Sequence, residues 1–265
     1  MWIIGLIMLL IAVALGLGYV SHKRRLQAME ETTMADVAHL QALAASMAEG
    51  VGAGSLFYRT EIQGTIHCDA PLISELSETA CVYYAMRVQR EYEETSYEQD
   101  AQGNRRTRTS RGRETVANNT RSVPFRVADA TGQIDVEPGG ARFIAEKALS
   151  QFLPEEGSGT GRLQCGRFLL DVGTMLSGGR RTLGYHYEEE VIPVGRTIYV
   201  LGEATDRHGH LCVSKPHDKG EFLVSVKREE ELQHEGHRAL VGFGLGAIAC
   251  GVIGAGLLLA GLLQR

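Results

Sequence analysis

The residues best suited to chemistry lie in the C-terminal half of the chain. His208, His210 and Cys212 alternate, so in a β-strand all three would point to one face. Imidazole nitrogen and thiolate sulfur are ligands that suit Zn²⁺. A zinc site also needs a fourth ligand or a bound water, for which Asp206 or His217 could serve. The same run is equally typical of a hairpin tip with a buried Cys212 behind it, so a weak metal site and a plain turn both stay open.

Two other histidines could activate a nucleophile, but their spacing selects no partner. His67 directly precedes Cys68, and His186 lies within "GYHYEEE". A His–Cys pair needs a third group that orients the imidazole, and the sequence indicates none. We therefore predict no catalytic residue and no cofactor.

Two aspartates flank a short loop in "SVPFRVADATGQIDVEP", residues 122–138. Apolar residues alternate on both sides of the loop, as in two half-buried strands joined by a tight turn. Asp129 and Asp135 could exchange protons only in a cleft that raises a carboxyl pKa. A turn explains the stretch more simply, with Asp129 bonding the backbone two residues on and Gly132 taking a positive φ.

A basic run follows an acidic one. "NRRTRTSRGR" comes directly after "EYEETSYEQD", and it would suit anionic lipid headgroups or an acidic partner. The alternative is the tip of a long hairpin in which the acidic and basic side chains neutralise each other. No aromatic residue interleaves the arginines as base stacking would require, and the net charge is only −5, so we predict no nucleic-acid partner. The arginines are Arg105, Arg106, Arg108, Arg111 and Arg113.

The elements that would position these residues lie between two apolar segments. Residues 2–20 and 239–263 carry no charge, and each is long enough for a helix to cross about 30 Å of hydrocarbon. A cleaved signal peptide is the alternative for the first, but no Lys or Arg precedes it and it runs directly into "SHKRR". We therefore expect transmembrane helices at residues 1–20 and 239–263.

Cations flank these segments on their inner sides. Lys23, Arg24 and Arg25 follow the first, and Lys227 and Arg228 precede the second. Short flanks rich in Lys and Arg stay cytoplasmic, so we predict residues 21–238 on that side and both termini outside. The cysteines show no short, repeated spacing, which favours reduced thiols.

Small residues recur within the second span. Gly242 and Gly246 form a G-x-x-x-G, and Ala247 with Gly251 continues the four-residue spacing. Such positions let helices approach closely in lipid, so the spans are expected to pack on each other or on a second copy of the chain. The alternative is that glycine is simply common in membrane helices.

The middle of the chain predicts an α+β fold. Apolar residues at three- and four-residue steps indicate an amphipathic juxtamembrane helix within residues 21–52, capped again at Thr33. Short alternating runs over residues 57–232 indicate a mainly antiparallel β-sheet or a small barrel, with a short helix at 141–152.

Several phrases of the β-rich region occur in an order typical of one family: "EIQGTIHCDAPLISELSETACVYY", "VPFRVADATGQIDVEP", "GYHYEEEVIPVGRTIYVLGEATDRHG" and "FLVSVKREEEL". Over roughly residues 60–232 the chain resembles the GIDE domain, also called the BAM or beside-a-membrane domain, of mitochondrial and chloroplast membrane ubiquitin ligases. The resemblance implies a domain that recruits partners beside the membrane. Ubiquitin transfer in that family belongs to a zinc-binding RING after the second span.

A RING needs eight Cys or His ligands, and only Gln264 and Arg265 follow residue 263 here. We therefore expect a short family member that is not an enzyme by itself. Three functions stay open: a membrane-anchored interaction or scaffold module, a ubiquitin-ligase-like component that works with a RING or transferase partner in trans, and a metal- or ligand-binding β-domain. The expected partners are membrane lipid, an unknown protein and a second copy bound through the membrane helices.

Overall fold

The computed structural model describes residues 2–30, 34–99, 105–155, 162–171, 180–207, 209–218 and 220–263. The chain divides into two compact units. Unit 1 combines residues 1–63 with residues 198–265, and unit 2 is residues 64–197. Unit 1 is therefore built from the two ends of the chain, and unit 2 is built from its middle.

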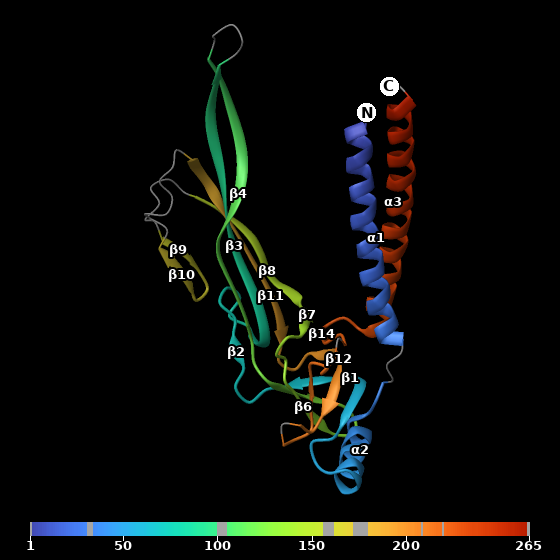
Figure 1. Ribbon diagram of the computed structural model, residues 1–265. Helices are drawn as coiled ribbons and strands as arrows, with labels where there is room; N and C mark the ends of the chain where they lie inside the picture. The colour runs from blue at the N-terminus through green and yellow to red at the C-terminus, as the bar shows by residue number, and fades with distance from the viewer. Residues whose placement is uncertain are drawn as a thin grey trace. The chain divides into compact units, whose positions relative to one another are not determined.

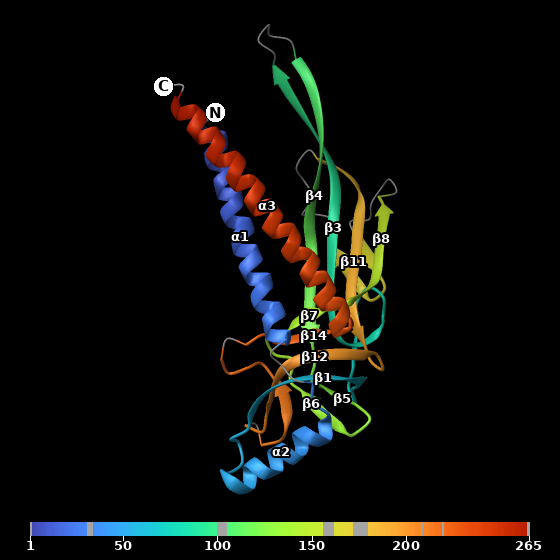
Figure 2. The same ribbon diagram turned by 90° about the vertical axis from the view of Figure 1, so that its right-hand side faces the viewer.

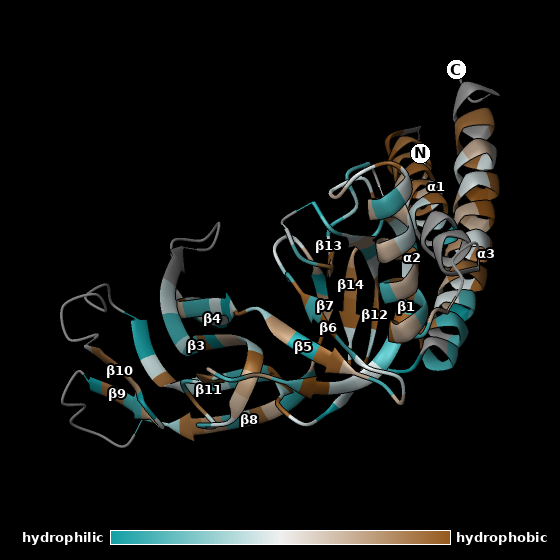
Figure 3. Ribbon diagram, turned by 90° about the horizontal axis from the view of Figure 1, so that it is seen from below, coloured by the Kyte–Doolittle hydropathy of each residue, from teal (hydrophilic) through white to brown (hydrophobic). Residues whose placement is uncertain are grey.

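Two long apolar helices belong to unit 1. Helix α1 covers Trp2–Glu30 and helix α3 covers Glu229–Leu263, and they lie side by side in both views (Figures 1 and 2). The stretches Ile3–Ser21 and Glu230–Leu259 are long and apolar enough to cross a membrane. Figure 3 shows hydrophobic residues along most of both helices and hydrophilic ones at the start of α3. This composition is typical of a two-pass membrane protein.

Helices α1 and α3 approach closely at a pair of glycines. A Cβ at Gly5 would lie 3.0 Å from the carbonyl oxygen of Gly254, and a Cβ at Gly254 would lie 3.1 Å from that of Gly5. A Cβ at Gly246 would meet Leu15 at 3.2 Å, whereas one at Gly242 or Gly251 would meet nothing within 4 Å. Of the three glycines selected from the sequence, Gly246 therefore faces α1, and contact of Gly242 and Gly251 with a second copy stays a prediction.

The juxtamembrane region is not one continuous helix. Helix α1 continues to Glu30, and a separate helix α2 covers Val37–Gly50, with Val37 and Leu40 buried. Thr33, the expected cap, lies outside the described residues. Asp36 occupies the N-cap of α2 in an extended conformation without a side-chain cap bond, and Ala35 donates its N–H to the Glu61 carbonyl. The segment that joins α1 to α2 therefore forms a backbone hydrogen bond with β1.

The β-structure of unit 1 centres on β12. Strand β12 (Thr197–Thr205) pairs antiparallel with β13 (Cys212–Ser214) and with β14 (Leu223–Ser225). Strand β1 (Phe57–His67) also pairs with β12. Every residue of β12 after Thr197 is buried, including Val200 and Leu201 in the middle. This strand is therefore the core of the unit and not an alternating surface strand.

Unit 2 contains a five-stranded antiparallel sheet. Its order is β2 (Leu72–Ile73), β3 (Ala80–Gln99), β11 (Arg180–Pro193) and β8 (Glu146–Pro154), and β4 (Arg105–Ser122) pairs with β3. Strands β3 and β4 form a long hairpin that stays paired from Tyr83–Ser122 to Gln99–Arg105 (Figures 1 and 2).

One face of this sheet forms a core. On β3 the buried side chains alternate as predicted, at Val82, Tyr84, Met86 and Val88. A small two-stranded sheet, β9 (Arg162–Cys165) and β10 (Phe168–Asp171), adds Leu163 and Phe168 to the cluster that contains Tyr84, Met86 and Val88. The alternation of β3 therefore reports a strand with one covered face.

The helix predicted at residues 141–152 is wrong. This segment contains β7 (Arg142–Ile144) and β8, and β8 pairs along most of its length with β11. Phe143 stacks on Tyr83 of β3, with 3.9 Å between ring centroids. Local helix propensity in "AEKALSQF" is weak compared with the backbone hydrogen bonds of a sheet edge, so tertiary pairing decides the conformation.

The hairpin around residues 129–132 has the predicted strands. Strand β5 (Phe125–Ala128) and strand β6 (Gln133–Val136) are antiparallel, and β5 also pairs with residues 65–67 of β1. Taken together, the elements confirm the predicted α+β class, with mainly antiparallel β-structure between two apolar helices in the sequence.

Candidate functional site

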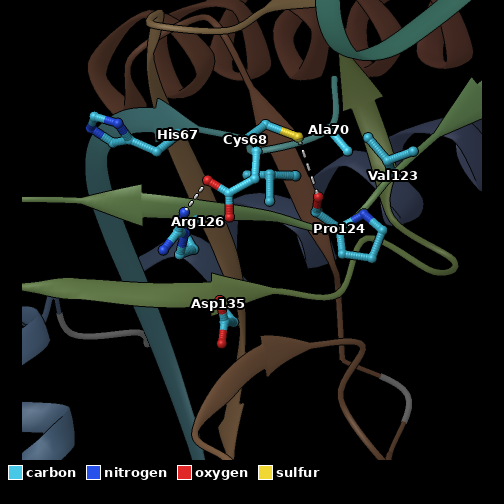
Figure 4. Close-up of a pocket in the computed structure, with 9 residues that line it drawn as sticks. His67, Cys68, Ala70, Val123, Pro124, Arg126 and Asp135 are labelled. Carbon is cyan, nitrogen blue, oxygen red and sulfur yellow. Dashed lines mark hydrogen bonds and ion pairs between the residues drawn. The ribbon is translucent and has the colours of Figure 1, made fainter. Parts of the chain in front are cut away.

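A cavity opens in unit 2 where β1 ends and β5 begins. It has a volume of about 350 Å³ (Figure 4). His67, Arg126 and Asp135 are direct neighbours across β1, β5 and β6, and opposed residues of neighbouring strands share a face of the sheet. The intervening residues Val127 and Ile134 are buried. Alternation along three strands therefore places a row of polar side chains at the cavity.

The walls of the cavity are partly apolar. They come from the segment that follows β1 and from the segment that joins β4 to β5, and the non-ionisable lining residues are Ala70, Val123, Pro124 and Phe125. Proline at position 124 has no backbone N–H to place in a sheet ladder, which suits the break between β4 and β5. The cavity thus combines a small apolar wall with one polar row.

Carboxylates outnumber cations in the cavity. Arg126 Nη2 donates to Asp69 Oδ1 at 2.6 Å, and Asp135 lies opposite Arg126 on β6 (Figure 4). The side chain of Asp69 is 86% exposed and that of Arg126 is 39% exposed. The ionisable side chains at the cavity are therefore two carboxylates, one guanidinium and the His67 imidazole.

His67 and Cys68 do not form a nucleophile pair. Their side chains point in opposite directions (Figure 4), as neighbours on an extended chain do. The Cys68 thiol points to the Pro124 carbonyl oxygen, with 3.7 Å between sulfur and oxygen. His67 is therefore not placed to take the thiol proton, and the arrangement supports binding and not covalent chemistry.

The described residues of the hypothetical metal set lie in different environments. His208 lies outside the described residues, His210 is exposed, and Cys212 is fully buried. Asp206 accepts backbone hydrogen bonds from Gly54 and Leu56, at 2.8 and 3.0 Å. Across the described ranges, no three His, Cys, Asp or Glu side chains are placed to hold one metal ion.

His217, the other candidate fourth ligand, has a structural partner. Its Nδ1 lies 2.7 Å from Oε2 of Glu203, a carboxylate that is only 4% exposed. The ring of Phe57 packs against the imidazole, with 4.9 Å between centroids. This histidine therefore satisfies a buried acid of β12.

The loop after β5 closes through the Asp129 side chain. Asp129 Oδ1 accepts hydrogen bonds from the Thr131 N–H at 2.7 Å, from the Thr131 hydroxyl at 2.7 Å and from the Gly132 N–H at 2.9 Å. The positive φ expected at Gly132 is not found: among the described glycines, those with positive φ lie elsewhere. The side-chain bonds close this loop without a left-handed residue, so the prediction of a positive φ at Gly132 is wrong.

The arginines of the basic run lie on β4, opposite the acids of β3. Arg111 pairs with Glu93 at 3.1 Å and Arg113 pairs with Glu91 at 3.0 Å. Glu91 also lies 2.6 Å from His186 Nε2, and its pKa is lowered by these partners, with His186 first. Arg108 is exposed, and the side chains of Arg105 and Arg106 lie outside the described residues.

Sequence reasoning missed Asp69, Arg126 and Asp135 as one site. A signal was present for two of them: once Asp129–Gly132 is taken as a four-residue loop, Arg126 must lie opposite Asp135. The pairing of β1 with β5, which adds His67 and Asp69, joins residues about 60 positions apart and has no local signal.

Comparison with protein families gives one match. The model of the GIDE family, described as E3 Ubiquitin ligase, matches residues 93–260. Neither the curated proteins nor the solved structures give a match. The matched segment begins within β3 and ends within α3, so it extends further toward the C-terminus than the expected 60–232. Because it covers more than half of the sequence and most of the β-rich region, the chain belongs to the GIDE family.

Proposed function

We propose that this GIDE-family chain is a two-pass membrane protein whose β-rich domain binds a protein partner beside the membrane. The observation that carries the proposal is the order of the elements. All strands lie between the two apolar helices, and α3 begins at Glu229, directly after β14 ends at Ser225. Short connections at a membrane helix hold the domain near the bilayer surface.

The cavity supports a binding role for this domain. Three neighbouring strands contribute residues to its lining, and residues held by a sheet keep a fixed geometry for recognition. Its polar row and apolar wall are the usual composition of a recognition site. We expect a partner to contact the rim at His67, which is exposed.

Photo-crosslinking in native membranes tests this function. A photoreactive residue at His67 is expected to give a discrete cross-linked protein product from the full chain. The matched control places the same photoreactive residue at the position of Ser150, which is exposed on β8 of the same unit. Equal product from both positions, or none from His67, contradicts partner binding at this cavity.

We further propose that the β-rich domain is cytoplasmic and that both termini are exoplasmic, because the cationic flanks lie at residues 23–25 and 227–228. A cysteine introduced at residue 103 is expected to resist a membrane-impermeant thiol reagent in intact cells. A cysteine introduced at residue 264 is expected to react. Both would be placed in a background with Cys68 and Cys165 replaced by serine, and the reverse labelling pattern contradicts this orientation.

The family description favours a second candidate function, a component of a ubiquitin ligase that works with a RING or transferase partner in trans. Purified full chain would be combined with ubiquitin, its activating and conjugating enzymes and a RING protein. Faster ubiquitin transfer than with the RING protein alone supports this candidate. Unchanged transfer with every RING protein tried contradicts it.

A further inference from the structure

We propose that strand β8 pairs antiparallel with β8 of a second copy of the chain and so joins the five-stranded sheets of the two copies. This interaction surface is separate from the cavity and does not depend on partner binding there. Its basis is a free backbone edge, exposed apolar side chains and opposite charges at the two ends of one strand.

Strand β8 forms one edge of the five-stranded sheet (Figure 2). Among the described strands it pairs only with β11. The Glu155 N–H donates to the Leu183 carbonyl of β11 at 3.1 Å, and the backbone groups of successive residues point alternately to the two sides of a strand. The N–H and C=O groups of Ser150 and Phe152 therefore point away from β11, toward the place of a further strand.

Residues 148–153 lack the usual protection of a sheet edge. Natural edge strands discourage pairing with charged side chains or proline. This segment, "ALSQFL", has neither, and Phe152 and Leu153 are 42% and 40% exposed. Strand β4, on the other side of β3, carries the charged Arg111 and Arg113. Of these two strands, β8 is therefore the one that accepts a further strand.

The backbone selects the register of the pair. Residues whose N–H and C=O groups point outward must face residues of the same kind. A two-fold axis at Gln151 places Ser150 of each copy opposite Phe152 of the other, and each of these pairs exchanges both of its backbone hydrogen bonds. Pro154 has no N–H, so a register centred closer to it would lose donors.

The side chains fit the same register. Opposed residues share a face of a sheet, so Leu153 of the second copy would lie beside Leu149, which packs against the core cluster of unit 2. Lys147 and Glu155 are exposed at opposite ends of the segment, and neither forms an ion pair with a described residue. Antiparallel pairing brings Lys147 of each copy near Glu155 of the other. The strand is therefore complementary to itself, which selects a second copy as the occupant.

Cysteine cross-linking of the full chain in detergent micelles tests the pair and its register. The cysteines that are not buried, Cys68, Cys165 and Cys250, would first be replaced by serine, since the Gln151 amide lies 3.7 Å from the Cys165 sulfur. At the two-fold axis the Cα atoms of residue 151 would be about 4.5 Å apart, within reach of a disulfide. We expect a mild oxidant to convert most Gln151→Cys chains to a linked dimer.

Lys147→Cys is the matched position on the same strand. In the proposed register its two copies would be about 26 Å apart, at roughly 3.3 Å per residue, so we expect about tenfold less linked dimer than from Gln151→Cys. Equal yields from the two positions overturn the proposal, because they would indicate random collision or contact through the membrane helices alone.

Charge reversal checks the ends of the pair. Lys147→Glu would place acidic side chains near each other at both ends, and we expect it to lower the yield of the Gln151→Cys dimer about threefold. Adding Glu155→Lys exchanges the two charges and should restore the yield. Both residues are exposed, so the melting temperature should not change. A loss that the double change does not restore overturns the antiparallel arrangement.

Photo-crosslinking separates this proposal from partner binding at the cavity. A photoreactive residue at Ser150 is expected to give a product that contains two copies of this chain, which differs in mass from a product with another protein at His67. A Ser150 product that contains only another protein would assign the edge to an extended partner segment and overturn the second copy. The dimer can therefore fail while partner binding at His67 stands, and the reverse also holds.

Discussion

Glu189 Oε1 accepts a hydrogen bond from the Leu76 backbone N–H at 2.8 Å, although 113 residues separate the two. The other oxygen accepts from the Ser77 N–H at 2.8 Å and from its hydroxyl at 2.6 Å. Glu189 is fully buried at the centre of "YEEEV". A buried carboxylate with three donors is satisfied, so this residue fastens the loop between β2 and β3 onto β11.

Loss of this carboxylate should release the loop. Glu189→Ala leaves buried N–H groups without an acceptor, and we expect it to lower the free energy of unfolding by about 2–4 kcal/mol. The control is Glu190→Ala on the exposed face of the same strand, for which we expect a change within about 0.5 kcal/mol. Urea midpoints of the full chain in micelles would measure both. Equal effects would show that strand context, and not the bonds to residues 76 and 77, determines the loss.

Asp206 should make the segment before β1 sensitive to acid. Burial acts to raise the pKa of this carboxyl, but the amides of Gly54 and Leu56 outweigh it and hold the pKa below the ordinary 3.8. A lowered folded-state pKa gives stability that is present above about pH 4 and is lost as the pH falls through the folded-state value. We expect the protection factors of the Gly54 and Leu56 amides, corrected for intrinsic exchange, to fall below pH 4. Asp206→Asn should exchange faster than the parent chain at pH 7 and should lack this acid step; identical profiles would contradict the role.

His217 and Glu203 should be energetically coupled. His217→Ala removes the 2.7 Å partner of a nearly buried carboxylate, which should destabilise the chain by about 1–3 kcal/mol. In a Glu203→Gln background, His217→Ala should lower the stability less. A neutral amide loses less than a carboxylate when its hydrogen-bond donor is removed. A double-mutant cycle on melting in micelles gives the coupling, and additive effects would argue against a direct interaction.

Cysteine reactivity should follow burial. Burial, with Glu189 as the second cause, raises the pKa of the Cys81 thiol to about 11, and Cys81 and Cys212 are both fully buried. The thiolate is the reactive form, so these two should resist alkylation at pH 7.5 in the folded chain. Cys68 is partly exposed at the cavity and should react first. Mass spectrometry of alkylated peptides checks the order, and early modification of Cys81 would contradict it.

The α1–α3 pair should depend on Gly254 and not on Gly251. Gly254→Ile forces a side chain against the backbone of Gly5, whereas a Cβ at Gly251 would meet nothing within 4 Å. Because close backbone approach stabilises helix pairs in lipid, the first variant should separate the helices. The readout is disulfide formation between Leu15→Cys and Gly246→Cys, which we expect Gly254→Ile to reduce several-fold and Gly251→Ile to leave unchanged. A loss with both variants would instead indicate contact with a second copy at Gly251.

Part of this molecule could be predicted from local patterns. Two uncharged segments indicate helices long enough for a bilayer, and the alternation at Val82–Val88 indicates a strand with one buried face. The loop at Asp129 follows from the chemistry of an aspartate that bonds its own backbone. These features depend on residues close together in the chain, which is why periodicity and residue type report them.

The sequence by itself determined the two apolar helices, the mainly antiparallel β-rich region between them and the family resemblance. Only the tertiary structure decided that residues 146–154 form an edge strand and not a helix, that Glu189 is buried, and that His67, Asp69, Arg126 and Asp135 surround one cavity. Each of these depends on partners 57 to 113 residues away or on strand pairing between distant segments. Local propensity differs by only about 1 kcal/mol or less per residue between conformations, so long-range pairing and burial decide which one is adopted.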